Sequence, residues 1–251
     1  MPRLGGRKLI YMINAMSNEE LAIGRDRFFN LLRKNGLLVR KRKNRVITTN
    51  SFHWMRKYPN LIRDLIVTRS NQIWVSDITY IKTEEGFLYL FLVTDLFSRR
   101  IMGWKLSENM EAQNAIMALT QAIENAEYSV KGTIHHSDRG LQYCCGEYIK
   151  ILLKNQISIS MTQSGDPLEN AVAERVNGIL KDEWIYEIQI KNKQQALNLV
   201  DQIIALYNEQ RPHLSLKYQT PVAVYQHHLK NSLNEFNKTK QIMQPVNHYQ
   251  D

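Results

Sequence analysis

Hydrophobic and polar positions alternate through the middle of the chain in the way that is typical of strands. β-Branched and aromatic residues gather in short runs that are separated by turn signals, such as Glu85-Gly86. These runs predict five strands, at residues 71–81, 87–96, 99–106, 132–138 and 157–161. Helical periodicity lies between and after the later strands, and it predicts helices at residues 110–126, 146–155 and 168–184.

The order of these elements, βββαβαβα, predicts an α/β fold. It favours three antiparallel strands followed by parallel strands that are joined by helical crossovers. That is the order of a ribonuclease H-like core. The sequence therefore predicts a mixed sheet flanked by helices.

The two ends of the chain are predicted to be helical. Amphipathic patterns cover residues 3–14 and 24–35, and Ser17 with Glu20 has the spacing of a capping box. The second pattern has a basic side, so the pair resembles a helix-turn-helix, although many helical hairpins look the same. A further helix is expected at 193–208, before a polar tail that starts near residue 230.

These patterns divide the chain into four regions. We expect a basic helical region that contacts DNA, a connector with partial helix, a catalytic core, and a helical C-terminal extension with the tail. In that order the regions are residues 1–45, 46–69, 70–185 and 186–251.

Composition narrows the class of protein. The chain has 251 residues and 43% hydrophobic content, with no apolar run near the ~18 residues that a membrane span needs. Its first residues are too polar for a secretory signal, and its two cysteines, Cys144 and Cys145, are adjacent, which excludes a disulfide framework. A reducing cytoplasm is the simplest compartment, and no membrane partner is expected.

Positive charge is concentrated at the N-terminal end. The net charge of the chain is +9, and residues 1–70 hold 16 Lys and Arg against 4 Asp and Glu. The remaining residues are slightly acidic, so the first quarter holds the whole excess. Such a concentration suits a polyanion such as DNA, and it also fits a solvated basic surface.

Three acidic residues occupy unusual places. Asp77 interrupts the first strand, Asp138 stands where the fourth strand ends, and Glu174 lies in the long helix. Each alone has an ordinary explanation, as a paired strand acid, a capping residue or a solvated helix residue. In this fold, however, the first and fourth strands are neighbours. The three carboxylates are therefore expected to share one pocket.

Three carboxylates in one pocket repel one another and need cations. Their hard oxygen atoms select Mg²⁺ or Mn²⁺, and two such ions can serve phosphoryl transfer by activating one oxygen and stabilising another. The long helix supports this site by its periodicity. A polar stripe is expected to face the acids, and it consists of Asn170, Glu174, Asn177 and Lys181. An apolar stripe is expected to pack on the sheet, and it consists of Val172, Val176 and Ile179.

Five stretches resemble bacterial insertion-sequence transposases with a retroviral integrase-like core, of the type encoded by the second of two reading frames. They are WVSDITYI, VTDLFSRRIMGW, HSDRGLQY, SGDPLENAVAERVNGILKDE and YNEQRPHLSL. The family motifs match Asp77, Asp138 and Glu174, and 35 residues separate the last two acids, as in the family. The chain departs from many relatives at Glu169, where they have Asp, and at Arg175, where they have Ser.

The resemblance implies a bacterial, nucleoid-associated enzyme that cleaves DNA at element ends and joins the 3′-hydroxyl ends to target DNA. It implies two Mg²⁺ or Mn²⁺ ions per site, self-association on DNA, and a first-frame helix-turn-helix partner or a frameshift fusion to it. Two rivals stay open: a nuclease of the same fold that only hydrolyses DNA, and a non-catalytic DNA-binding protein derived from a transposase.

Candidate DNA contacts follow from charge and position. They are Arg25, Arg27, Arg33, Lys34, Arg40, Lys41, Arg42, Lys43, Gln142, Asn170, Asn177, Lys181, Arg211 and His213. For Arg211 and His213, an equally good reading is that they stabilise a turn. A zinc site at the His135-His136 and Cys144-Cys145 pairs is disfavoured, because the usual spacers between paired ligands are missing.

Overall fold

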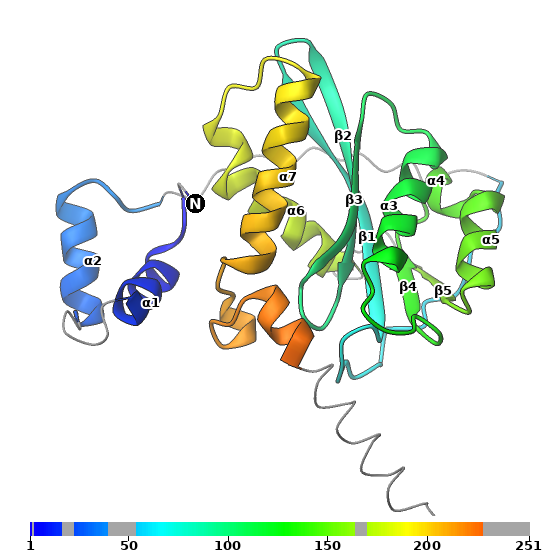
Figure 1. Cartoon of the computed structure of the whole chain (residues 1–251), viewed down its shortest axis with the longest axis horizontal. Coiled ribbons are helices and arrows are strands. Elements are labelled where there is room, and N and C mark those ends of the chain that lie inside the picture. The colour runs from blue at the N-terminus through cyan, green and yellow to red at the C-terminus, as the bar shows by residue number, and fades with distance from the viewer. Residues whose placement is uncertain (2, 17–22, 40–53, 164–169, 228–251) are drawn as a thin grey trace, which may run out of the picture.

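The computed structural model describes residues 1, 3–16, 23–39, 54–163 and 170–227 (Figure 1). The expected capping box at Ser17 and the polar tail lie outside the described residues. Within the described part, no helix combines the length and the apolar character that crossing a lipid bilayer requires.

A five-stranded mixed sheet forms the centre of the protein. Its strands are β1 (Ile73–Thr83), β2 (Gly86–Asp95), β3 (Ile101–Ser107), β4 (Ile134–Ser137) and β5 (Ser158–Met161). They lie in the order β3-β2-β1-β4-β5, with β1, β2 and β3 antiparallel and β1, β4 and β5 parallel. The predicted α/β class, the mixed sheet and the position of each strand are confirmed.

Helices cover both faces of the sheet (Figure 1). On one face lie α3 (Ala112–Glu124), α4 (Leu141–Cys144) and α5 (Gly146–Lys154); on the other lie α6 (Ala171–Glu183) and α7 (Lys193–Glu209). The alternation along β2 divides the core, because Phe91 packs toward the α3 face and Leu90 and Leu92 toward α6 and α7. The short helix α4 was not predicted, since four residues carry too little periodicity.

Close packing of α3 on β3 depends on one glycine. A Cβ atom on Gly103 would collide with the backbone carbonyl oxygen of Ala118 and lie 2.6 Å from the backbone nitrogen of Ala122. Because backbone atoms cannot move aside as a flexible side chain can, any larger residue would push α3 off the sheet.

Helices precede and follow the sheet in the described residues, as predicted. The N-terminal pair is α1 (Gly6–Met16) and α2 (Arg25–Lys34), which bury Phe28 and Leu32. After α6 follow a short 3-10 turn η2 (Ile185–Glu187), α7, a second turn η3 (Leu214–Leu216) and a helical stretch at 221–227.

The described part of the connector, residues 54–69, consists of turns and extended chain without helix, unlike the partial helix expected there. At two points the connector is bonded to β5, which holds it there as extended chain. The N–H of Met161 donates to the carbonyl oxygen of Pro59 at 3.2 Å, and the N–H of Leu61 donates to the Oγ of Ser160 at 2.9 Å.

Candidate active site

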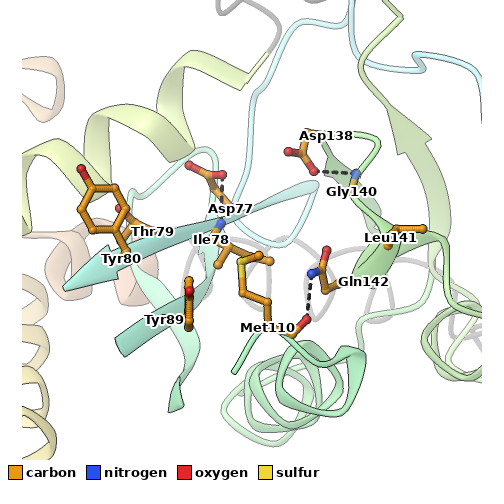
Figure 2. Close-up of a pocket in the computed structure, with 10 residues that line it drawn as sticks. All are labelled: Asp77, Ile78, Thr79, Tyr80, Tyr89, Met110, Asp138, Gly140, Leu141 and Gln142. Carbon is orange, nitrogen blue, oxygen red and sulfur yellow. Dashed lines mark hydrogen bonds between the residues drawn. The ribbon is translucent and has the colours of Figure 1, made fainter. Parts of the chain in front are cut away.

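Pairing of β1 with β4 places two of the predicted acids side by side. The parallel register runs from Ile73 opposite Ile134 to Ser76 opposite Ser137. Asp77 is the next residue of β1, and Asp138 directly follows the last residue of β4. Both line one pocket of about 220 Å³ at the end of the paired strands (Figure 2).

Two hydrogen bonds orient the carboxylate of Asp77. Its Oδ1 accepts from the backbone N–H of Ile78 at 2.9 Å, and its Oδ2 accepts from Nδ2 of Asn177 at 2.8 Å. Asn177 is buried on α6, so this contact joins the helix to the strand at the acid itself. Asn177 was predicted as a DNA contact, but in the structure its amide nitrogen is engaged with Asp77.

Asp138 is held by the turn that follows β4. Its Oδ1 accepts from the backbone N–H of Gly140 at 3.0 Å. A Cβ atom on Gly140 would lie 3.0 Å from that oxygen and 3.2 Å from Oε1 of Gln142. Glycine therefore leaves the space beside the carboxylate open, which a side chain would fill.

Acidic groups gather at the pocket. Burial raises the pKa of Asp77 to about 7, and the charges of Asp138 and, to a smaller degree, Glu174 act in the same direction against the hydrogen bonds of Asn177 and Ile78. Burial and the charge of Asp138 also raise the pKa of Tyr143 well above its ordinary value. Carboxylates in such surroundings favour a proton or a cation.

Glu174 is near this pair but does not complete a cluster with it. It lies exposed in the first turn of α6, and its charge contributes to the raised pKa of Asp77. Across the described parts of the chain, no group of three His, Cys, Asp or Glu side chains stands close enough to hold a metal ion. The structure thus brings together two of the three predicted acids and leaves the third outside the pair.

Three members of the predicted polar stripe, Asn170, Asn177 and Lys181, contact β1, while Glu174 is exposed. Nδ2 of Asn170 donates to the carbonyl oxygen of Ser76 at 3.0 Å, and the ammonium of Lys181 lies 4.1 Å from the ring centre of Tyr80. Asn170 is buried, so its amide holds the helix on the strand and does not face solvent. On the apolar stripe, Val176 and Ile179 are buried in the core.

Arg211 and His213 are buried and bonded to other groups of the protein. Arg211 is 2% exposed, and its guanidinium donates two hydrogen bonds to the carboxylate of Glu183, at 2.6 and 2.7 Å. It also donates to Nε2 of His213 at 2.9 Å. Burial and the charge of Arg211 lower the pKa of His213 to about 2, which keeps this imidazole neutral. Neither side chain is free for a phosphate.

The predicted contacts of the N-terminal region divide into two sets. Arg25, Arg27, Arg33 and Lys34 are exposed on α2. Arg40, Lys41, Arg42 and Lys43 lie outside the described residues.

Two candidates remain, Gln142 on α4 and His135 on β4. Gln142 lines the pocket, and its Nε2 donates to the carbonyl oxygen of Met110 at 2.7 Å. His135 is buried and bonded to Ser76 and Tyr148, which accounts for it without a zinc ion.

Comparison with known proteins agrees with this architecture. Residues 67–167 match a family model described as an integrase core domain, and residues 155–221 match a second model of the same description. The chain is similar to a cryo-EM structure of the simian T-cell lymphotropic virus intasome in complex with PP2A regulatory subunit B56 gamma. The TM-score is 0.54 at 18% identity, over 88% of this chain and 70% of that chain, which is a likeness of fold.

Curated relatives are insertion-sequence proteins. The chain is 33% identical over 210 residues to the insertion element IS600 uncharacterized 31 kDa protein of Shigella sonnei, covering 83% of this chain and 77% of that protein. It is 34% identical over 184 residues to the transposase InsF for insertion sequence IS3A of Escherichia coli (strain K12), covering 72% of this chain and 64% of that one. With its integrase-like sheet and paired acids, the chain belongs to the IS3 family of insertion-sequence transposases, which have a retroviral integrase-like core.

Proposed function

We propose that the chain cleaves DNA at the ends of its insertion sequence and joins the resulting 3′-hydroxyl ends to target DNA. Asp77, Asp138 and Glu174 would hold two Mg²⁺ or Mn²⁺ ions for this phosphoryl transfer. The observation that carries the proposal is the position of Asp77 and Asp138, which follow the last residue pair of β1 and β4 and share one pocket.

The donor set of the pocket fits a hard divalent cation. Its acids, Asp77 and Asp138, offer carboxylate oxygens, and Gly140 leaves the oxygen of Asp138 accessible. Burial, and after it the charge of Asp138, raises the pKa of Asp77, and a cation would offset both effects. The fit is incomplete at Glu174, which would have to approach the pair. Bound there, the ions would activate the attacking oxygen and neutralise charge on the reacting phosphate.

The protein's own groups would position the DNA and the acids. Asn177 and Gly140 fix the orientation of the two carboxylates through single hydrogen bonds. Lys181, next along the stripe of α6, would face a phosphate near the cut. The exposed arginines of α2 would contact the DNA backbone farther away.

We propose the same four regions that the sequence predicts: a DNA-contacting region (1–45), a connector (46–69), the core (70–185) and an extension (186–251). Two element ends need two active sites, so we propose self-association on DNA. A first-frame helix-turn-helix protein, separate or fused by frameshifting, would recognise the ends. The work would take place at the nucleoid of the bacterial cytoplasm.

A strand-transfer assay tests this function. A labelled duplex that ends in the element's terminal repeat is incubated with plasmid, Mg²⁺ and the full chain, with and without the first-frame protein. We expect joined product, which Asp138→Asn should lose and Asp201→Asn, a change at an exposed aspartate on α7, should keep. Cleavage without joining would indicate the hydrolysis-only nuclease. DNA binding with neither reaction, under both conditions, would indicate the non-catalytic protein.

A further inference from the structure

The pocket that holds the two acids has an apolar side that metal ions and phosphate do not need. Ile78, Tyr89, Met110 and Leu141 line it together with Asp77 and Asp138. Figure 2 shows Ile78, Tyr89 and Met110 grouped together, below the two acids in that view. Met110 is 40% exposed and Leu141 is 43% exposed. Large apolar groups left open beside charged ones mark a surface for an apolar part of a ligand.

The size of the pocket limits what this part can be. Its volume of about 220 Å³ is below the roughly 300–1,000 Å³ of sites for drug-sized ligands. That space suits one flat ring system and excludes a stacked pair. A DNA strand whose phosphate lies at Asp77 and Asp138 must place its adjoining nucleoside within one sugar unit of that phosphate. The apolar side begins at Ile78, the residue after Asp77.

Gln142 adds a polar group in a fixed orientation. Its Nε2 is used by the hydrogen bond to the carbonyl oxygen of Met110, at 2.7 Å. Figure 2 shows the oxygen of this amide turned toward Gly140 and Asp138. The pocket therefore offers an acceptor beside an apolar wall. An exocyclic amino group on the edge of adenine, cytosine or guanine can donate to such an acceptor.

We propose that this side of the pocket receives one unstacked nucleobase, that of the nucleotide joined to the reacting phosphate. The base would lie against Tyr89 and Met110 with its amino edge at Oε1 of Gln142. The proposal rests on the proposed function, because DNA at the two acids brings the base to this position. Aromatic and apolar side chains hold unstacked bases in this manner when an enzyme takes a base out of the stack.

The experiment uses the full chain and an end duplex with 2-aminopurine as the base next to the reacting phosphate. Binding is followed by fluorescence with Ca²⁺ in place of Mg²⁺ to slow cutting. We expect a change in 2-aminopurine fluorescence that follows saturation of the wild-type protein and is lost with Tyr89→Ala. Two matched variants should behave as wild type: Tyr128→Ala and Met117→Ala, at side chains that are exposed outside the pocket.

A second arm changes the DNA and leaves the protein intact. An abasic site at the same nucleotide should weaken binding or joining by wild type roughly 5- to 100-fold. Tyr89→Ala should weaken them to a similar degree on intact DNA and add little on abasic DNA, since both changes remove the same interaction. Tyr89→Phe keeps the ring and should retain most of the effect.

The outcomes separate this proposal from the function beneath it. Wild type that joins DNA, yet gives no fluorescence change and tolerates the abasic site, would overturn the base pocket and leave the function standing. Wild type that neither cuts nor joins any end would overturn the function, while the fluorescence arm still decides whether the pocket binds a base. If Tyr89→Ala fails to fold, the abasic arm and Met110→Ala decide the matter.

Discussion

Helix α6 contacts two acidic centres of opposite design. At one, Asn177 bonds to Asp77, which lies near two further acids, Asp138 and Glu174, and interacts with the charge of Lys181. At the other, Glu183 accepts from Arg211 twice and from the ammonium of Lys8 at 2.9 Å. Burial raises the pKa of Asp77 to about 7. Burial would also raise the pKa of Glu183, but the hydrogen bonds and charges of Arg211 and Lys8 outweigh it, and the net pKa is lowered.

The difference shows which centre needs a ligand. Glu183 has all its partners within the chain, so its ion pairs are complete when the protein is folded. The hydrogen-bond donors of Asp77 are neutral, and the nearby charge of Lys181 does not outweigh burial and the two acids, so the site favours a cation or proton from outside. Helix α6 thus connects a structural centre at Glu183 with a centre at Asp77 that requires a ligand.

The structural centre also connects distant parts of the chain. Lys8 belongs to α1, Glu183 ends α6, and Arg211 follows α7. A second pair, Arg3 with Glu187 at 3.1 Å, and the stacked rings of Tyr11 and Tyr218, with centres 4.6 Å apart, join the same regions. The N-terminal helices are therefore anchored to the helix that contacts Asp77.

The largest effect is expected from a substitution in the centre that requires a ligand. Asp77→Asn should reduce the rate of strand transfer on the order of 10³-fold, because it removes a carboxylate ligand and leaves the fold unchanged. The measurement is the rate of joining at saturating DNA, with circular dichroism as a check of folding. A variant that joins at the wild-type rate would remove Asp77 from the site.

The same variant should gain stability, with a defined pH dependence. The pKa of Asp77 is raised in the fold from 3.8 to about 7, so ionising it opposes folding. The free-energy cost of ionising Asp77 is absent below about pH 4, increases between about pH 4 and pH 7, and is constant above about pH 7. Without metal, Asp77→Asn should be more stable than wild type at pH 8 by up to about 4 kcal/mol, and equal to it at pH 4. Mg²⁺ should narrow the gap by stabilising wild type.

The second largest effect is expected from a substitution in the centre around Glu183. Arg211→Ala leaves the buried carboxylate of Glu183 without its main partner and should lower the free energy of unfolding by about 3–5 kcal/mol. Denaturant unfolding measures the loss. A triple variant, Arg211→Met with Glu183→Leu and Lys8→Met, removes all three charges and should recover much of it. If the triple variant is no better than Arg211→Ala, lost packing and not unpaired charge explains the effect.

A smaller effect is expected for Lys8 than for Arg211, the two cations that pair with Glu183. Burial and the charge of Arg211 lower the pKa of Lys8, so the lysine gains less from the pair than Glu183 does. Lys8→Met keeps the apolar stem and should lower the free energy of unfolding by roughly 1–2 kcal/mol. Hydrogen exchange should speed up in α1 but not in the sheet. Lys34→Met, at an exposed lysine on α2, serves as the control.

The smallest effect concerns the exposed arginines of α2. Changing Arg25, Arg27 and Arg33 to alanine should reduce the slope of log affinity for DNA against log salt by up to about 0.9 for each phosphate that one of them neutralises. The melting temperature should remain unchanged, because these side chains are exposed. Substitution is preferable to deletion of 1–45, which would also remove Lys8. An unchanged slope would mean that this charge only faces solvent.

Local patterns predicted most of the fold and part of the site. The five strands, α3, α5, α6 and α7 follow from alternation and helical periodicity, because each pattern is repeated over several residues. Asp77 and Asp138 could be expected together, since strand order alone makes β1 and β4 neighbours. The four residues of α4 and the turns of the connector have no such repeat. Helix α4 was therefore not predicted, and partial helix was predicted where the described connector has turns.

The roles of single polar residues could not be predicted from the same patterns. Asn170, Asn177, Arg211 and His213 all look like polar groups for DNA in the sequence, yet each is buried and bonded within the protein. Nothing in the residues around Arg211 reveals that Glu183, 28 positions earlier, pairs with it.

The sequence by itself determined the order of strands and helices, the family motifs with their three acids, and the excess of positive charge before residue 70. These depend on the periodicity and identity of residues along the chain. Only the tertiary structure decided which polar side chains are enclosed, that Glu174 lies outside the pair of Asp77 and Asp138, and that α1 is anchored through Lys8. Burial and electrostatic pairing depend on which distant segments pack together, and that is a property of the folded chain.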